Sequence, residues 1–268
     1  MITQDTLRLW GSVMDGSSIS PERAERLTTR GPWVGGFLLL SACLSLLSLV
    51  ALVRSLATMT YLNIHFAHEV DPFSRAVSYY VFYGDGREEF AASVTVLAMG
   101  TVLMLGGMWA VGIRFGGAAT TFFGIWCTSL TLCAIFPTDN SKSIASTSGL
   151  IHQVAGASLF VSLPLAGVSL ARRLGTDAQW ARTARGVRRM AFVAMGLAAA
   201  YLATRLPDIF PSLAIPGVLD GRGISGLVQR ALFGLEVLML MALAVRLLRV
   251  TVSSVRERRE PARAEATG

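Results

Sequence analysis

The chain of 268 residues is 53% hydrophobic and only 15% charged, and its mean hydropathy is +0.54. Soluble domains carry about 25% charged residues, so this composition excludes an ordinary soluble domain. The formal net charge of +7 suits nucleic-acid binding in general, but the positions of the basic residues argue against that class here.

Six apolar stretches divide the chain, and each is long enough to cross a bilayer core of about 30 Å. In chain order they are Trp33–Val53, Phe90–Ile113, Gly117–Phe136, Leu150–Ala171, Met190–Leu206 and Gly226–Val245. Because lipid offers no partner to unpaired backbone groups, each stretch is expected to be a helix. The sequence therefore predicts an all-α, polytopic integral membrane protein with a six-helix transmembrane domain over residues 33–247. Residues 1–32 are predicted to be a cytoplasmic arm, and residues 248–268 a disordered basic tail.

The basic residues predict the orientation of the spans. Of the 24 Lys and Arg residues, 17 fall in the two terminal segments, the second-to-third turn and the fourth-to-fifth loop. By the positive-inside rule these segments are cytoplasmic, which places both termini in the cytoplasm. We therefore predict a multi-pass protein of the cell membrane whose basic surface meets anionic membrane lipids rather than nucleic acid. The sequence indicates no particular oligomeric state.

The loop after the first span, on the predicted outer side, contains the pattern of a short helix. Asp71 followed by Pro72 is typical of a helix start. Apolar residues then recur at helical spacing, at Phe73, Val77 and Tyr80. We expect a short interfacial helix near Pro72–Val81 that contains Ser78 and lies over the mouth of the bundle.

Other polar residues gather on the same predicted side. Ionisable groups near lipid normally pair, face the bundle interior or line a wet cavity. Asp139 and His152 flank the third-to-fourth loop, and we expect them to meet Arg230, because an arginine near lipid seeks a carboxylate. Glu236 lies about two turns inside the sixth span and must find a partner on another span or stay protonated. The predicted ligand-binding residues are Asp139, His152, Arg230, Glu236 and Ser78.

Three of these positions also have a purely structural interpretation. His152 can meet an interfacial carbonyl or water, and Asp139 can cap a helix or a turn after Pro137. Arg230 can extend to the lipid headgroups. The sequence is compatible with both interpretations.

An apolar bundle with a few convergent polar groups at its mouth is typical of a pocket for a lipid or small amphiphile. We therefore predict a non-enzymatic membrane protein with an outward-facing polar pocket and no cofactor. One alternative is a transporter or channel, although the two halves show no evident repeat. Another is a metal-dependent intramembrane hydrolase in which His65, His68 and His152 hold a zinc ion that activates water.

Four short motifs stand at the predicted outer ends of the spans. They are Asp71-Pro72 with Val77-Ser78, Phe136-Pro137-Thr138-Asp139, Ile151-His152 and Gly226-Leu227-Val228-Gln229-Arg230. Together they resemble a prokaryotic membrane family catalogued as domain of unknown function 998, over approximately residues 35–245. The resemblance implies a six-helix integral membrane protein and carries no established activity.

Overall fold

The computed structural model describes residues 32–140, 145–209 and 221–267, and in these ranges the chain is helical without strands. Six of the described helices are long and apolar enough to cross a membrane. They are α3 (Pro32–His65), α4 (Gly86–Ala110), α5 (Gly117–Ile135), α6 (Thr147–Leu174), α7 (Ala181–Ile209) and α8 (Ser225–Thr267). The predicted all-α, six-span architecture is confirmed. The predicted arm over residues 1–32 lies outside the described residues apart from Pro32, with which α3 begins.

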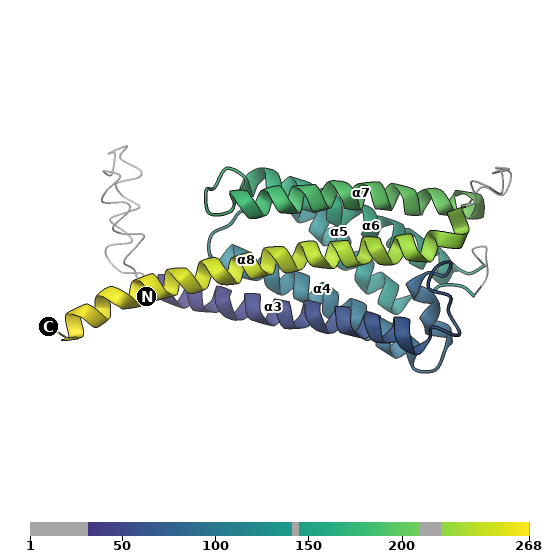
Figure 1. Ribbon diagram of the computed structural model, residues 1–268, viewed down its shortest axis with the longest axis horizontal. Coiled ribbons are helices and arrows are strands. Elements are labelled where there is room, and N and C mark those ends of the chain that lie inside the picture. The colour runs from purple at the N-terminus through teal and green to yellow at the C-terminus, as the bar shows by residue number, and fades with distance from the viewer. Residues whose placement is uncertain (1–31, 141–144, 210–220, 268) are drawn as a thin grey trace.

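The six long helices follow one another around the bundle in chain order (Figure 1). Each packs against the next, and α8 closes the ring by packing against both α7 and α3. Consecutive helices are antiparallel, so the described chain starts and ends at the same end of the bundle (Figure 1). We call this the terminal end, and the opposite end, which carries the loop over residues 66–85, the first-loop end.

The first and last helices are longer than their apolar stretches. The 34 residues of α3 span about 51 Å, against a bilayer core of about 30 Å. The 43-residue α8 continues to Thr267, whereas a disordered tail was predicted from residue 248. Hydropathy marks only the part of a helix that lies in lipid, whereas the helical hydrogen bonds continue beyond it.

Buried hydroxyl contacts join α3 to α4 at every seventh residue. They connect Ser41 Oγ to the Gly107 carbonyl (2.8 Å), Ser48 Oγ to the Gly100 carbonyl (2.7 Å), and the hydroxyls of Ser55 and Ser93 (3.0 Å). A spacing of seven keeps these residues on one face of each helix, and small residues let the two backbones approach closely. The pair α3–α4 is therefore held in a defined register.

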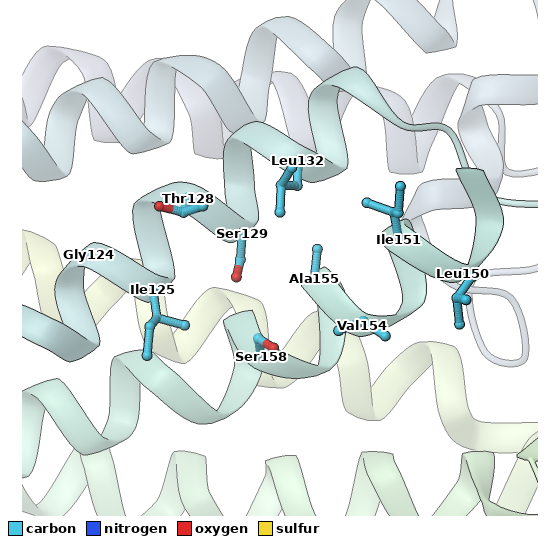
Figure 2. A pocket seen from close by; sticks show the side chains of 10 residues that line it. All are labelled: Gly124, Ile125, Thr128, Ser129, Leu132, Leu150, Ile151, Val154, Ala155 and Ser158. Atoms are coloured by element: carbon cyan, nitrogen blue, oxygen red, sulfur yellow. The ribbon is translucent and has the colours of Figure 1, made fainter. Parts of the chain in front are cut away.

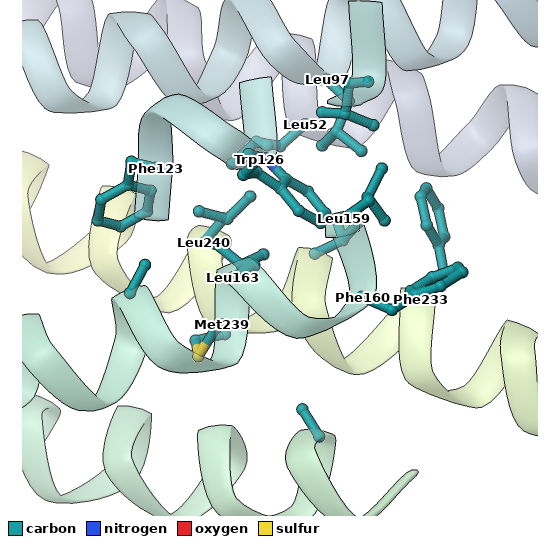
Figure 3. Packing of buried hydrophobic residues seen from close by; sticks show 14 of the residues in the cluster. Leu52, Leu97, Phe123, Trp126, Leu159, Phe160, Leu163, Phe233, Met239 and Leu240 are labelled. Carbon is teal, nitrogen blue, oxygen red and sulfur yellow. The ribbon is translucent and has the colours of Figure 1, made fainter. Parts of the chain in front are cut away.

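Large apolar side chains fill the interior of the ring (Figure 3). Leu97, Trp126 and Leu163, from three different helices, are fully buried. The indole nitrogen of Trp126 donates to Thr101 Oγ1 at 3.3 Å, which adds a polar link between α5 and α4. This packing sets the positions of the helix ends, and thus of the loops that carry the predicted site residues.

The first loop contains a short helix, as predicted, but with a later start. A 3-10 helix, η1, covers Val77–Phe82, while a second, η3 (Gly221–Ile224), precedes α8. The Asp71 carboxylate accepts from the Phe73 backbone N–H (3.1 Å) and the Ser74 hydroxyl (2.5 Å), so the segment after Asp71 is a turn instead of a first helical turn.

Candidate functional site

Arg230, near the start of α8, is the centre of a hydrogen-bond network at the first-loop end. Its guanidinium donates to the carbonyl oxygens of Pro72 (2.8 Å) and Arg75 (2.7 Å), and to the Tyr80 hydroxyl (2.7 Å). Its Nε donates to the Asn63 side-chain oxygen, to which the Tyr80 hydroxyl also donates at 2.7 Å. Arg230 therefore ties α3, the first loop and α8 together.

Further contacts extend this attachment along the start of α8. They pair Gln229 Oε1 with the Val77 N–H (2.9 Å), Ser225 Oγ with the Ser74 carbonyl (2.9 Å), and the Leu227 N–H with the Phe73 carbonyl (3.0 Å). Gly226 permits the approach, because a Cβ there would collide with the backbone carbonyls of Pro72 and Arg75. We call residues 71–80 together with Ser225–Arg230 the loop clamp. Ser78, a predicted ligand-binding residue, is buried within it.

Asp139 closes the loop between α5 and α6. Its carboxylate accepts from the Ala145 N–H (2.8 Å), the Ser146 N–H (3.1 Å) and the Ser146 hydroxyl (2.6 Å). Ser146 in turn caps α6 by accepting from the Gly149 N–H at 3.0 Å. The hydrogen bond from the Ser146 hydroxyl, followed by that from the Ala145 N–H, lowers the pKa of Asp139, so this loop is organised around a carboxylate.

His152 lies beside the same loop and is buried. Its Nδ1 is 2.7 Å from the Phe136 carbonyl, which can only accept, so Nδ1 carries the hydrogen. His152 makes a smaller contribution to the lowered pKa of Asp139. The structure thus brings Asp139 and His152 to one loop. There Asp139 caps a turn and His152 meets a backbone carbonyl, which are the structural roles that the sequence left open for them.

The expected contact between Arg230 and Asp139 is not formed. Arg230 takes its partners from α3, the first loop and its own helix, whereas Asp139 takes its partners from its own loop. Carbonyl, amide and hydroxyl oxygens satisfy the guanidinium donors here, because the first loop wraps around the side chain. Ligand contact by Asp139, His152, Arg230 and Ser78 stays a prediction.

Glu236 is completely buried in α8. Neither of its carboxyl oxygens has a hydrogen-bond partner among the described residues. A partner on another span, one of the two predicted alternatives, is therefore not found in the described part of the chain.

The histidines do not gather as the hydrolase alternative requires. His65 ends α3 and stacks on Tyr61 with ring centroids 5.0 Å apart, while His152 is held by Phe136. Within residues 32–140, 145–209 and 221–267, no three His, Cys, Asp or Glu side chains come together as potential metal ligands. The geometry gives no support to a zinc ion held by His65, His68 and His152.

A groove of about 600 Å³ lies between α5 and α6 (Figure 2). Gly124, Thr128 and Ser129 line it from α5, and Ala155 and Ser158 line it from α6. Three large apolar residues at its rim are exposed on the outside of the bundle: Ile125, Leu150 and Val154. The groove therefore opens on the outer surface of the bundle, between two helices that are long and apolar enough to span a membrane.

The groove is apolar apart from the hydroxyl groups of Thr128, Ser129 and Ser158, and none of these forms a hydrogen bond to another described residue. Helical hydroxyls commonly bond to a carbonyl one turn back, as Thr131 on the same helix does with Cys127 at 3.0 Å. Ser129 is only 4% exposed, and Figure 2 shows its oxygen directed into the space between the two helices. The groove therefore offers unpaired hydroxyls within an apolar wall.

None of the five predicted ligand-binding residues lines this groove. Four of those five residues are ionisable, whereas the groove is lined by aliphatic, small and hydroxyl-bearing residues. Its sequence signal is the spacing of Gly124 to Thr128 and of Val154 to Ser158, each four residues apart. The same spacing is typical of a helix–helix contact, so only the structure distinguishes a filled contact from an open groove.

A family model described as "Protein of unknown function (DUF998)" matches residues 55–246. The matched segment runs from the second half of α3 into α8. It includes the loop clamp, the groove, and the loop between α5 and α6 that contains Asp139, which we call the Asp139 loop. No curated protein and no solved structure matches the chain. The family resemblance identified from the four motifs is confirmed.

Proposed function

Because the chain belongs to the DUF998 family of proteins of unknown function, we propose its function from its own geometry. It binds a membrane lipid or another amphiphile that enters sideways into the groove between α5 and α6. The observation that carries this proposal is an apolar groove, open to lipid, whose hydroxyl groups have no partner among the described residues.

The dimensions and chemistry of the groove favour an amphiphile. Its volume of about 600 Å³ falls within the range of about 300–1,000 Å³ that is usual for ligand pockets. The aliphatic side chains of the wall suit a hydrocarbon chain, because contact between apolar groups removes both from water and leaves no polar group unpaired. The hydroxyls of Ser129 and Ser158 suit an oxygen-bearing group of the ligand, such as an ester, amide, carbonyl or hydroxyl.

The Asp139 loop supports the rim of the groove. Asp139 and Ser146 fix the first turn of α6, and the rim residues Leu150 and Ile151 follow directly after Gly149. Asp139 therefore positions the rim of the groove through Ser146.

Filling the groove tests the proposal. Gly124 lines the groove, and a Cβ there meets no atom within 4 Å, so Gly124→Leu begins its side chain in open space at the groove. Gly196 on α7 is also exposed, and a Cβ there likewise meets no atom within 4 Å. Because Gly196 does not line the groove, Gly196→Leu is the matched control. The full chain is reconstituted with a phospholipid that carries a photoreactive acyl chain, and labelled peptides are identified by mass spectrometry.

We expect labelling of the peptides that contain Ser129 and Ser158 in the unmodified protein. In Gly124→Leu this labelling should fall at least about fivefold, which corresponds to about 1 kcal/mol of binding free energy. In Gly196→Leu it should stay at the level of the unmodified protein. Equal labelling of all three proteins, or labelling spread evenly over every lipid-facing helix, would contradict the proposal.

A further inference from the structure

Glu236 lies well inside the bundle and is separate from the groove. Arg230 is placed at the level of Asn63 by their hydrogen bond. Glu236 is six residues further along α8, which is about 9 Å deeper towards the terminal end. It is 0% exposed, and both of its carboxyl oxygens lack a partner among the described residues.

The surrounding helices place buried hydroxyls at a similar depth. Because α3 and α8 are antiparallel, the same distance along α3 from Asn63 ends within about one turn of Ser55. Ser55 and its partner Ser93 on α4 are 0% and 2% exposed, and their hydroxyls bond to each other. Ser93 also donates to the Ser55 carbonyl at 3.0 Å. These groups satisfy one another and leave Glu236 without a hydrogen bond.

The charged side chains of the packed helices are engaged elsewhere or face outwards. Arg54 on α3 is exposed on the outside of the bundle. The Arg205 guanidinium on α7 lies over the Tyr201 ring, 5.5 Å from its centroid. Neither they nor the charged residues of α4 and α6 form a salt bridge with Glu236.

A carboxylate at this position would lose its hydration and gain neither a hydrogen bond nor a counter-ion in return. The closed bundle is therefore compatible with the neutral acid and incompatible with the carboxylate. We propose that Glu236 is an intramembrane proton-binding site, which holds its proton while the bundle is closed and exchanges it with water when the first-loop end opens. Release transfers the proton to a water molecule and leaves the carboxylate, and rebinding reverses that transfer.

The first-loop end offers the shorter route to water. From Glu236 the loop clamp at Arg230 is six residues away along α8, whereas Arg246, at the other side, is ten residues away. The loop clamp covers the shorter route through the contacts of Arg230 with Pro72, Arg75 and Tyr80. Loosening the clamp should thus speed exchange of the Glu236 proton.

Infrared spectroscopy of the full chain in lipid nanodiscs at neutral pH tests the protonation state. The C=O stretch of a carboxylic acid is resolved from that of a carboxylate. We expect a carboxylic-acid band that is lost in Glu236→Gln and kept in Glu88→Gln, because Glu88 is exposed in the first turn of α4. Transfer to D₂O should shift the band as O–H becomes O–D, and the rate of this shift measures proton exchange.

The second part of the experiment tests the route. Arg230→Gln should accelerate the deuterium shift at least about tenfold, while Arg249→Gln, at an exposed position of the same helix, should leave it unchanged. If Arg230→Gln does not fold, Tyr80→Phe removes one hydroxyl of the clamp and serves for the same comparison.

Three results would overturn the proposal. The first is a wild-type spectrum without a carboxylic-acid band that depends on Glu236. The second is a band that never shifts in D₂O, since that proton would be a permanent part of the fold. The third is an exchange rate that loosening the clamp does not change, since the proton would then leave by another route.

Discussion

At the scale of single residues, Arg230 is an arginine near the membrane that is satisfied without a carboxylate. A guanidinium has five N–H donors, and backbone carbonyls, an amide oxygen and a phenol can take them when a loop folds around the side chain. Here Pro72 and Arg75 supply the carbonyls and Asn63 the amide oxygen. The Tyr80 ring centroid also lies 5.7 Å from the guanidinium carbon, which adds a cation–π contact.

We predict that Arg230→Gln destabilises the protein by about 3 kcal/mol, because several acceptors of the loop clamp lose their donor. Thermal unfolding should begin at lower temperature, and amide exchange over residues 71–83 should become faster. Arg249→Gln removes an exposed arginine from the same helix and should change neither measurement. Equal unfolding temperatures for the two variants would show that the clamp contributes little to stability.

At the scale of elements, the start of α6 depends on close packing between a glycine and a loop carboxylate. A Cβ at Gly149 would overlap with the Asp139 side chain, which is held in place by the hydroxyl and backbone of Ser146 and by Ala145. A larger residue at Gly149 must therefore displace the group that organises the loop. Further along the same helix, a Cβ at Gly156 meets no atom within 4 Å.

We predict opposite effects for two identical substitutions in α6. Gly149→Ala should lower the free energy of unfolding by about 1–3 kcal/mol, because the added methyl group breaks the hydrogen bonds of Asp139. Gly156→Ala should leave stability unchanged or raise it by up to about 1 kcal/mol, since alanine has the higher helix propensity. Denaturant unfolding in detergent compares the two, and equal shifts would mean that the Asp139 loop adapts to the methyl group.

At the scale of the whole molecule, the closed ring of six antiparallel helices places both described chain ends at the terminal end (Figure 1). Exposed arginines in the last turn of α6, Arg172 and Arg173, and in the first turn of α7, Arg182, belong to the helix ends at that same end of the bundle. Seventeen of the 24 Lys and Arg residues belong to the segments predicted to be cytoplasmic. The positive-inside rule therefore predicts that the terminal end faces the cytoplasm.

We predict that a reporter enzyme active only outside the cytoplasm is silent when fused after Gly268. The same reporter inserted at Gly84, in the first loop, should be active, because that loop lies at the opposite end of the bundle. Activity of the Gly268 fusion together with silence of the Gly84 fusion would reverse the predicted orientation and leave the six-helix fold unaffected.

Part of the candidate site was predictable because its residues are close in sequence. Asp139 and His152 flank one short loop, so any antiparallel pairing of α5 and α6 brings them to the same place. Arg230 has its partners more than 150 positions away, in the first loop. Its contacts depend on how the ring closes, and the general preference of arginine for carboxylates indicated the wrong partner.

The helical class and the six spans follow from sequence alone, because twenty consecutive apolar residues are a local property and lipid leaves a helix as their only stable form. The family follows from four short motifs, which are local as well. Three features are visible only in the folded chain: the loop clamp surrounds Arg230, Glu236 has no partner among the described residues, and an open groove separates parts of α5 and α6. These features depend on the register and spacing between helices that pack together, whether neighbours in the chain or not. A shift of one residue, about 1.5 Å along a helix and about 100° around it, would change every such contact without altering the hydropathy of any span.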